Sequence, residues 1–143
     1  MGILTRLFGA RADSARDLEQ LRARLESFMR PSTALVDSRQ LTIPAQRERF
    51  AAYVYGAATA LAETRGLGDT ESLALLVMFL RGSSRMTEQE VSYLVGRAMA
   101  LAREPEGAAV HDAGAQALTE WLAGDAGTAV GRLAESLRHA ATD

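Results

Sequence analysis

The sequence predicts an all-α fold, a compact and irregular bundle of about six helices around a central apolar helix at residues 70–81. Three observations support this prediction. Residues 73–80 form an unbroken apolar run in which most residues favour helix and only Val77 is β-branched. Apolar residues in the other segments recur at helical spacing. These segments begin and end at capping residues, prolines and glycines.

The flanks of the apolar run define the central helix. Asp69 and Thr70 are candidate N-caps, and Glu71 adds negative charge to the first turn. Arg81 and Gly82 supply a cation and a C-cap glycine at the other end. A helix that is apolar on all sides is normally surrounded by other helices. We therefore expect residues 70–81 to be buried, and they fall short of the roughly 20 residues that a bilayer span needs.

Length and composition fit a single helical domain, which we place at residues 13–143. All sixteen basic residues are arginine, and the chain has no lysine, asparagine or cysteine. These absences exclude lysine Schiff-base chemistry, cysteine nucleophiles, disulfides and thiolate metal ligands. The abundance of arginine, alanine and glycine indicates a GC-rich coding sequence, from which we infer a bacterial source. We recognise no signal peptide or membrane span and therefore expect a cytoplasmic protein.

Charge is distributed unevenly along the chain. Residues 1–49 carry nine arginines against six acids, whereas residues 50–143 carry seven arginines against twelve acids. A nucleic-acid-binding domain normally has a clustered basic face. Because the larger part of this chain is acidic, we expect no nucleic-acid partner.

Residues 1–12 form an N-terminal amphipathic segment. Its apolar residues share one helical face: Ile3, Leu4, Leu7 and Phe8. The segment could pack on the bundle as a short turn, or it could attach to a membrane surface. We favour packing on the bundle, because one short segment with two arginines binds bilayers weakly.

The first long helix is predicted to begin at Asp13 or Ser14 and to end near Arg30, before Pro31. Its apolar residues form one narrow seam: Leu18, Leu21, Leu25 and Phe28. A seam this narrow packs at the edge of a bundle, which is the commoner case, or against a partner. Exposed aromatic residues are frequent interface anchors, and Tyr55 is a candidate for one. We therefore treat the seam and Tyr55 together as the candidate interaction surface.

The second long helix is predicted to run from Pro44, a favourable first-turn position for proline, to Arg65. Residues 31–43 before it lack helical spacing, and their apolar residues indicate attachment to the core. Small residues recur at every fourth position of the second helix, so another helix can approach closely: Ala52, Gly56 and Ala60. We interpret Gly96 as part of the surface that faces Gly56.

Three further helices are expected after the central one. A capping box that begins at Thr87 starts a helix that ends before Pro105. The last two helices are predicted at about residues 108–123 and 125–141, with Gly124 as the hinge between them.

The tightest polar cluster follows the central helix: Arg81, Ser83, Ser84 and Arg85. A helix begins directly after this cluster, and its backbone N–H groups and dipole could hold a phosphate or carboxylate. Glu88 and Glu90 in the first turn of that helix would repel an anion. We therefore favour a solvated loop and keep an anion site as the alternative.

The sequence shows no motif for catalysis or metal binding. His111 and His139 lack partners at the spacing of metal ligands. Neither a Gly-rich phosphate loop nor a His-Glu-x-x-His pattern occurs. We expect no metal and no cofactor, and we favour a non-enzymatic protein.

Together these features predict a non-enzymatic bacterial protein–protein interaction module: an adaptor, a small chaperone or an inhibitor/immunity-type protein. Its partner would be another protein, with a homodimer as a further option. The first alternative is an anion- or nucleotide-binding protein, or an enzyme, that uses residues 81–87. The second alternative is a membrane-surface protein that attaches through residues 1–12.

Overall fold

The computed structural model describes the backbone of residues 2–83 and 86–142 and the side chains of residues 15–82 and 86–138. The described residues form helices and no strand, which confirms the predicted all-α bundle. The elements in chain order are α1 (Gly2–Ala34), the 3₁₀ turn η1 (Gln40–Thr42), α2 (Pro44–Glu63), α3 (Asp69–Ser83), α4 (Glu88–Leu101), α5 (Pro105–Leu122), α6 (Ala126–Val130) and α7 (Arg132–Thr142). Among them, no helix combines the length and the apolar character that crossing a bilayer requires.

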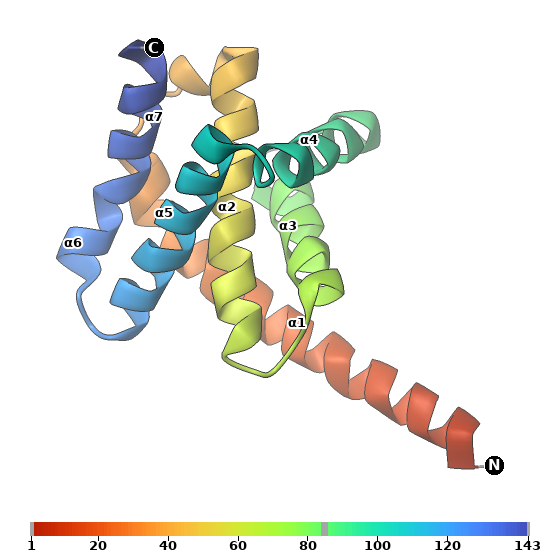
Figure 1. Cartoon of the computed structure of the whole chain (residues 1–143). Helices are drawn as coiled ribbons and strands as arrows, with labels where there is room; N and C mark the ends of the chain where they lie inside the picture. Colours follow the sequence, from red (N-terminus) through yellow and green to blue (C-terminus); the bar gives the residue numbers. More distant parts are fainter. Residues whose placement is uncertain (1, 84–85, 143) are drawn as a thin grey trace.

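The centre of the bundle is α2 and not the segment 70–81. Twelve of the twenty residues of α2 are buried, and α2 lies between α5 on one side and α3 on the other (Figure 1). Helix α3 buries one face, through Leu75, Leu76, Phe79 and Leu80, and leaves the intervening residues partly exposed. The apolar run does form a helix, but it is not fully buried all round, because Leu73 and Val77 pack against the core only in part. Small residues on α2 let neighbours approach it from several directions.

Helices α2 and α5 are in backbone contact. A Cβ atom at Gly56 would lie 1.8 Å from the carbonyl oxygen of His111, and a Cβ at Gly114 would lie 2.0 Å from the carbonyl oxygen of Tyr53. Only glycine fits at both positions. The prediction that Gly96 faces Gly56 is wrong, since nothing lies within 4 Å of a Cβ placed at Gly96.

Helix α1 is continuous across both of its predicted boundaries. It begins at Gly2 rather than at Asp13 or Ser14, and it passes Pro31 to end at Ala34. Ser32, directly after Pro31, is inaccessible to solvent, and the Thr33 hydroxyl donates a 2.8 Å hydrogen bond to the carbonyl oxygen of Met29. These contacts offset the backbone hydrogen bond that proline cannot donate. The first turns of α1 extend beyond the other helices (Figure 1).

The connection from α1 to α2 is attached to the core at fewer points than predicted. Val36 is buried and Leu41 packs partly against the core, but Leu35 and Ile43 are 57% and 50% exposed. The turn η1 lies within this connection and brings Leu41 and Thr42 next to the N-terminus of α2.

Local signals in the second half of the chain act largely as predicted. The Thr87 hydroxyl caps α4 by accepting a hydrogen bond from the backbone N–H of Glu90 at 3.2 Å. Gly124 has a φ of 93°, a left-handed conformation that favours glycine at the hinge after α5. The predicted helix at residues 125–141 is divided into α6 and α7. Arg132 of α7 donates two hydrogen bonds to the carboxylate of Glu120 in α5, one of them 3.0 Å long, and so links the two helices.

Candidate functional site

The predicted interaction surface is buried in the chain's own core. Leu21, Leu25 and Phe28 are at most 1% exposed, and Tyr55 is 7% exposed. Leu18 is partly buried and packs against the same core. The Phe28 ring lies 5.6 Å from that of Trp121 in α5, measured between centroids. This prediction is therefore wrong: the narrow seam holds α1 in the bundle and leaves none of these buried side chains free for a partner.

Tyr55 joins three helices. Its hydroxyl donates a 2.6 Å hydrogen bond to the carboxylate of Asp69 at the start of α3. Its ring meets His111 of α5 edge-on, with 5.0 Å between centroids. Burial, together with the hydrogen bond to Asp69, raises the pKa of Tyr55 to about 12. Tyr55 is thus a structural anchor.

Replacing Tyr55 with Phe is expected to lower the free energy of unfolding by about 1–2 kcal/mol at neutral pH, because the ring packing remains and a hydrogen bond to a carboxylate is lost. The raised pKa means that the folded state keeps the Tyr55 proton to a higher pH than the unfolded state does. The stability of the unsubstituted protein should therefore fall as the pH rises from 10 towards 12. Burial also raises the pKa of Tyr53. Tyr53 therefore adds a loss of stability at high pH that is the same in the unsubstituted chain and in Tyr55→Phe.

Urea unfolding at neutral pH and near pH 11 measures both effects. Tyr55→Phe should lose less stability between the two conditions than the unsubstituted chain. An equally steep loss in the two proteins would contradict the role assigned to Tyr55.

The predicted anion loop is described only in part. The side chains of Ser83, Ser84 and Arg85 lie outside the described residues. Arg81 is exposed at the end of α3 and forms a 2.8 Å ion pair with Glu88 of α4. Glu88 therefore already pairs with Arg81, the only cation of this cluster whose side chain the structure describes.

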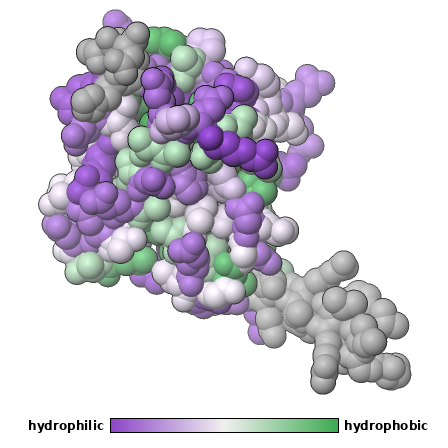
Figure 2. Space-filling model, viewed as in Figure 1, coloured by the Kyte–Doolittle hydropathy of each residue, from purple (hydrophilic) through white to green (hydrophobic). Residues whose placement is uncertain are grey.

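A groove opens between α1, η1, the N-terminal end of α2 and the C-terminal end of α3. Its volume is about 810 Å³, within the range typical of ligand pockets. The apolar lining comes from residues far apart in the sequence: Met29, Leu41, Phe50, Phe79 and Met86. Met29, Phe50 and Phe79 are buried and form the floor. On the face shown in Figure 2, by comparison, hydrophobic residues appear as small areas among hydrophilic ones.

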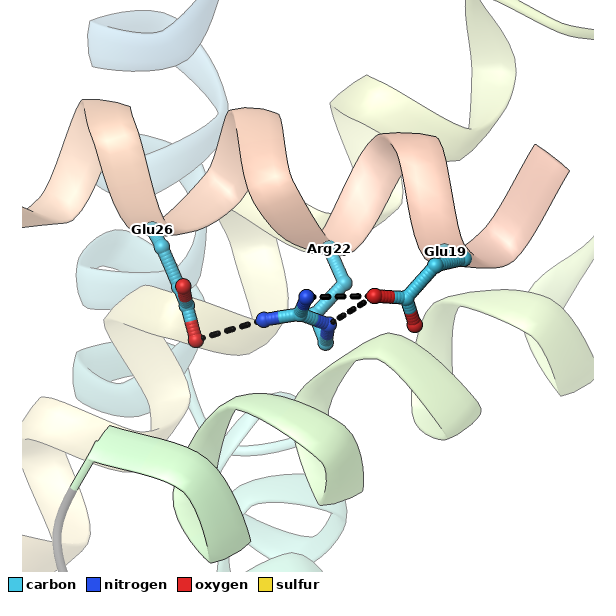
Figure 3. Close-up of polar contacts among 3 residues, drawn as sticks. All are labelled: Glu19, Arg22 and Glu26. Carbon is cyan, nitrogen blue, oxygen red and sulfur yellow. Dashed lines mark hydrogen bonds and ion pairs between the residues drawn. The ribbon is translucent and has the colours of Figure 1, made fainter. Parts of the chain in front are cut away.

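Charged groups line the sides of the groove, and two of the three are paired within the chain. Glu26 forms a 2.8 Å ion pair with Arg22. Arg22 also donates a hydrogen bond to Glu19, so it bridges two acids along α1 (Figure 3). Arg47 of α2 lies 3.3 Å from Glu90 of α4. Among the described side chains, no acid forms an ion pair with Arg30, which is exposed. The groove therefore presents an available positive charge at Arg30.

Two hydroxyl groups of the groove lining already donate hydrogen bonds within the chain. Thr33 donates to the carbonyl oxygen of Met29 at 2.8 Å, and Thr42 donates to that of Arg39 at 2.6 Å. The lining thus offers few neutral hydrogen-bond donors, and an occupant would be recognised mainly through apolar contact and charge.

The sequence prediction missed this groove because it ended the first helix at Pro31. One signal was present: the groove-lining residues of α1 follow a single helical stripe across that proline, at Glu26, Met29, Arg30, Thr33 and Ala34. The remaining lining residues come from segments that only the folded chain brings together.

The described residues contain no cluster of three or more histidine and acidic side chains that could hold a metal ion. His111 lies 3.6 Å from the adjacent Asp112, and its ring packs on Tyr55. His111 therefore contributes to the packing between α2 and α5.

The fold and groove define an all-α bundle with an amphipathic concave site on the part of the chain that the structure describes. No protein-family model matches the chain, and neither a curated protein nor a solved structure is significantly similar to it.

Proposed function

We propose that this chain is a non-enzymatic interaction module of a bacterial cytoplasm, and that the groove between α1, α2 and α3 receives an apolar segment of another protein. The observation that carries the proposal is the combination of an apolar floor with an open, charged rim. Such a surface can bury the apolar side chains of a partner and orient them through the rim. The groove replaces the buried seam of α1 as the candidate docking surface.

The charge pairing at the rim supports binding rather than catalysis. A general acid or base must be free to exchange a proton with a substrate. Glu26, the one carboxylate among the described residues of the lining, is paired with Arg22, and the arginines of the lining keep their protons. These charged groups favour a rim that fixes the orientation of a bound segment.

The proposal is tested by blocking the groove without disturbing the core. Ala34 is exposed, ends α1 and lines the groove, so Ala34→Trp should fill its mouth. Ala109 is an exposed alanine of α5 outside the groove, and Ala109→Trp is the matched control. Peptides of about 15 residues, selected from a random display library on the unsubstituted chain, serve as probes.

The selected peptides are expected to bind the unsubstituted chain and Ala109→Trp equally and Ala34→Trp at least about tenfold more weakly, as measured by fluorescence polarisation. Circular dichroism and urea unfolding should show that both variants remain folded. Peptides that bind folded Ala34→Trp as tightly as the unsubstituted chain would remove the groove as the docking site. A selection that enriches no peptide would also count against the proposal.

A further inference from the structure

An occupant of the groove has to satisfy its own backbone hydrogen bonds. The lining comes from helices, the turn η1 and short connections, so it presents no strand edge to an extended peptide. The hydroxyls of Thr33 and Thr42 already donate to backbone carbonyls. Burying unpartnered peptide groups costs free energy. A helical segment, whose backbone bonds are internal, therefore fits this groove better than an extended one.

The dimensions of the groove agree with a helical occupant. The lining stripe of α1 extends from Glu26 to Ala34, which is about 12 Å along the helix axis. That length corresponds to about two turns of a second helix laid beside α1. Such a helix presents apolar side chains at every third or fourth position.

The floor of the groove can adapt to different apolar side chains. Met29 in the floor and Met86 elsewhere in the lining have flexible thioether side chains that fill irregular gaps. Phe50 and Phe79 in the floor pack together, with 6.3 Å between ring centroids. This floor accepts apolar side chains of varied shape, so it supplies affinity more than selectivity.

Arg30 supplies the selectivity. Its guanidinium is at the rim, on the same stripe of α1 as Glu26, and Arg22 neutralises Glu26. Arg47 of α2, the other arginine of the lining, is paired with Glu90. A carboxylate of the occupant would meet the positive charge of Arg30, whereas a basic group would be repelled by it.

We propose that the groove binds an acidic amphipathic helix of a partner protein and that a carboxylate of this helix pairs with Arg30. This inference rests on the proposed function and names the chemistry of the partner. It specifies three features of the bound segment: helical backbone, apolar face and negative charge at the rim.

Two synthetic peptides of about 15 residues test the inference. Both carry leucine at positions i, i+3, i+4 and i+7; one has glutamate at the flanking positions and the other has lysine there. Their affinities are measured for the unsubstituted chain, for Arg30→Glu, and for Arg16→Glu. Arg16 is an exposed arginine of α1 outside the groove and gives the matched control.

The unsubstituted chain and Arg16→Glu should bind the acidic peptide about tenfold more tightly than the basic one, with the preference falling as salt is raised. Arg30→Glu should abolish or reverse the preference. The bound acidic peptide should show increased helicity by circular dichroism. Ala34→Trp should weaken its binding.

Three outcomes would overturn the inference. In the first outcome, the unsubstituted chain binds both peptides equally tightly, and Ala34→Trp weakens the binding of both. This result would contradict the preference for an acidic partner but would still support the groove as the docking site. Failure of both peptides to bind, together with groove-dependent binding of dodecanoate, would assign the site to a small amphiphile and remove the proposed function as well. A preference for the acidic peptide that Arg30→Glu leaves unchanged would remove Arg30 as its anchor.

Discussion

Replacing Gly56 with alanine is expected to lower the free energy of unfolding by about 3 kcal/mol or more, the upper end of the cost of overpacking a core. The added Cβ would lie 1.8 Å from the carbonyl oxygen of His111 and 2.7 Å from its carbonyl carbon. Both atoms belong to the backbone of α5, so no side-chain rotation can relieve the clash. The two central helices must move apart, and the packing around them is lost.

Urea unfolding followed by circular dichroism measures this effect, with Gly96→Ala as the control. Gly96 lies inside α4 with nothing within 4 Å of an added Cβ, so its replacement should stabilise the protein by about 0.5–1 kcal/mol. Gly114→Ala should destabilise like Gly56→Ala. The double variant should lose less than the sum, because both changes separate the same helices. Stability losses of similar size at Gly56 and Gly96 would contradict the backbone contact.

Replacing Leu76 with aspartate is expected to unfold the chain. Leu76 is inaccessible to solvent in the face of α3 that packs against the bundle. The change removes about 1.5–3 kcal/mol of apolar burial and places an unpaired carboxylate in the core, at a further cost of several kcal/mol. The sum approaches the whole stability of a typical domain, about 5–15 kcal/mol.

The loss of cooperative thermal unfolding would show this effect directly. Thr70→Asp introduces the same charge into the same helix at an exposed position of its first turn. There it should be neutral or slightly stabilising because of the helix dipole. Leu76→Met keeps the volume and should cost less than about 1.5 kcal/mol. A folded, cooperative Leu76→Asp protein would show that this face of α3 is not part of the core.

Helix boundaries could be predicted from the sequence where the signal lies within a few residues. Pro44 begins α2, Thr87 caps α4, and Gly124 follows α5 in a left-handed conformation. Each of these effects depends on the backbone geometry of one turn. The first helix is the exception at both ends. It begins at Gly2 rather than at Asp13 or Ser14, and it passes Pro31 because the burial of Ser32 outweighs the local effect of the proline.

The site could not be predicted in the same way, because burial depends on which helices meet. The pattern of the seam at Leu21 and Leu25 is compatible with an internal or an external contact, of which the internal one is commoner, and the structure shows that the seam is internal. The groove combines Met29, Phe50, Phe79 and Met86 from four separate parts of the chain. No local pattern relates these positions.

By itself, the sequence determined that the chain is helical, where most of its helices begin, and that it lacks lysine and cysteine chemistry. Only the tertiary structure decided that α2 is the central helix, that Tyr55 is an anchor, and that Arg30 stands beside an apolar groove. The physical reason is that caps and periodicity act within a turn of the chain. The position of α2 at the centre depends instead on its close approach to α5, a helix distant in the sequence. That approach is possible because α2 carries Gly56 and α5 carries Gly114 at the contact.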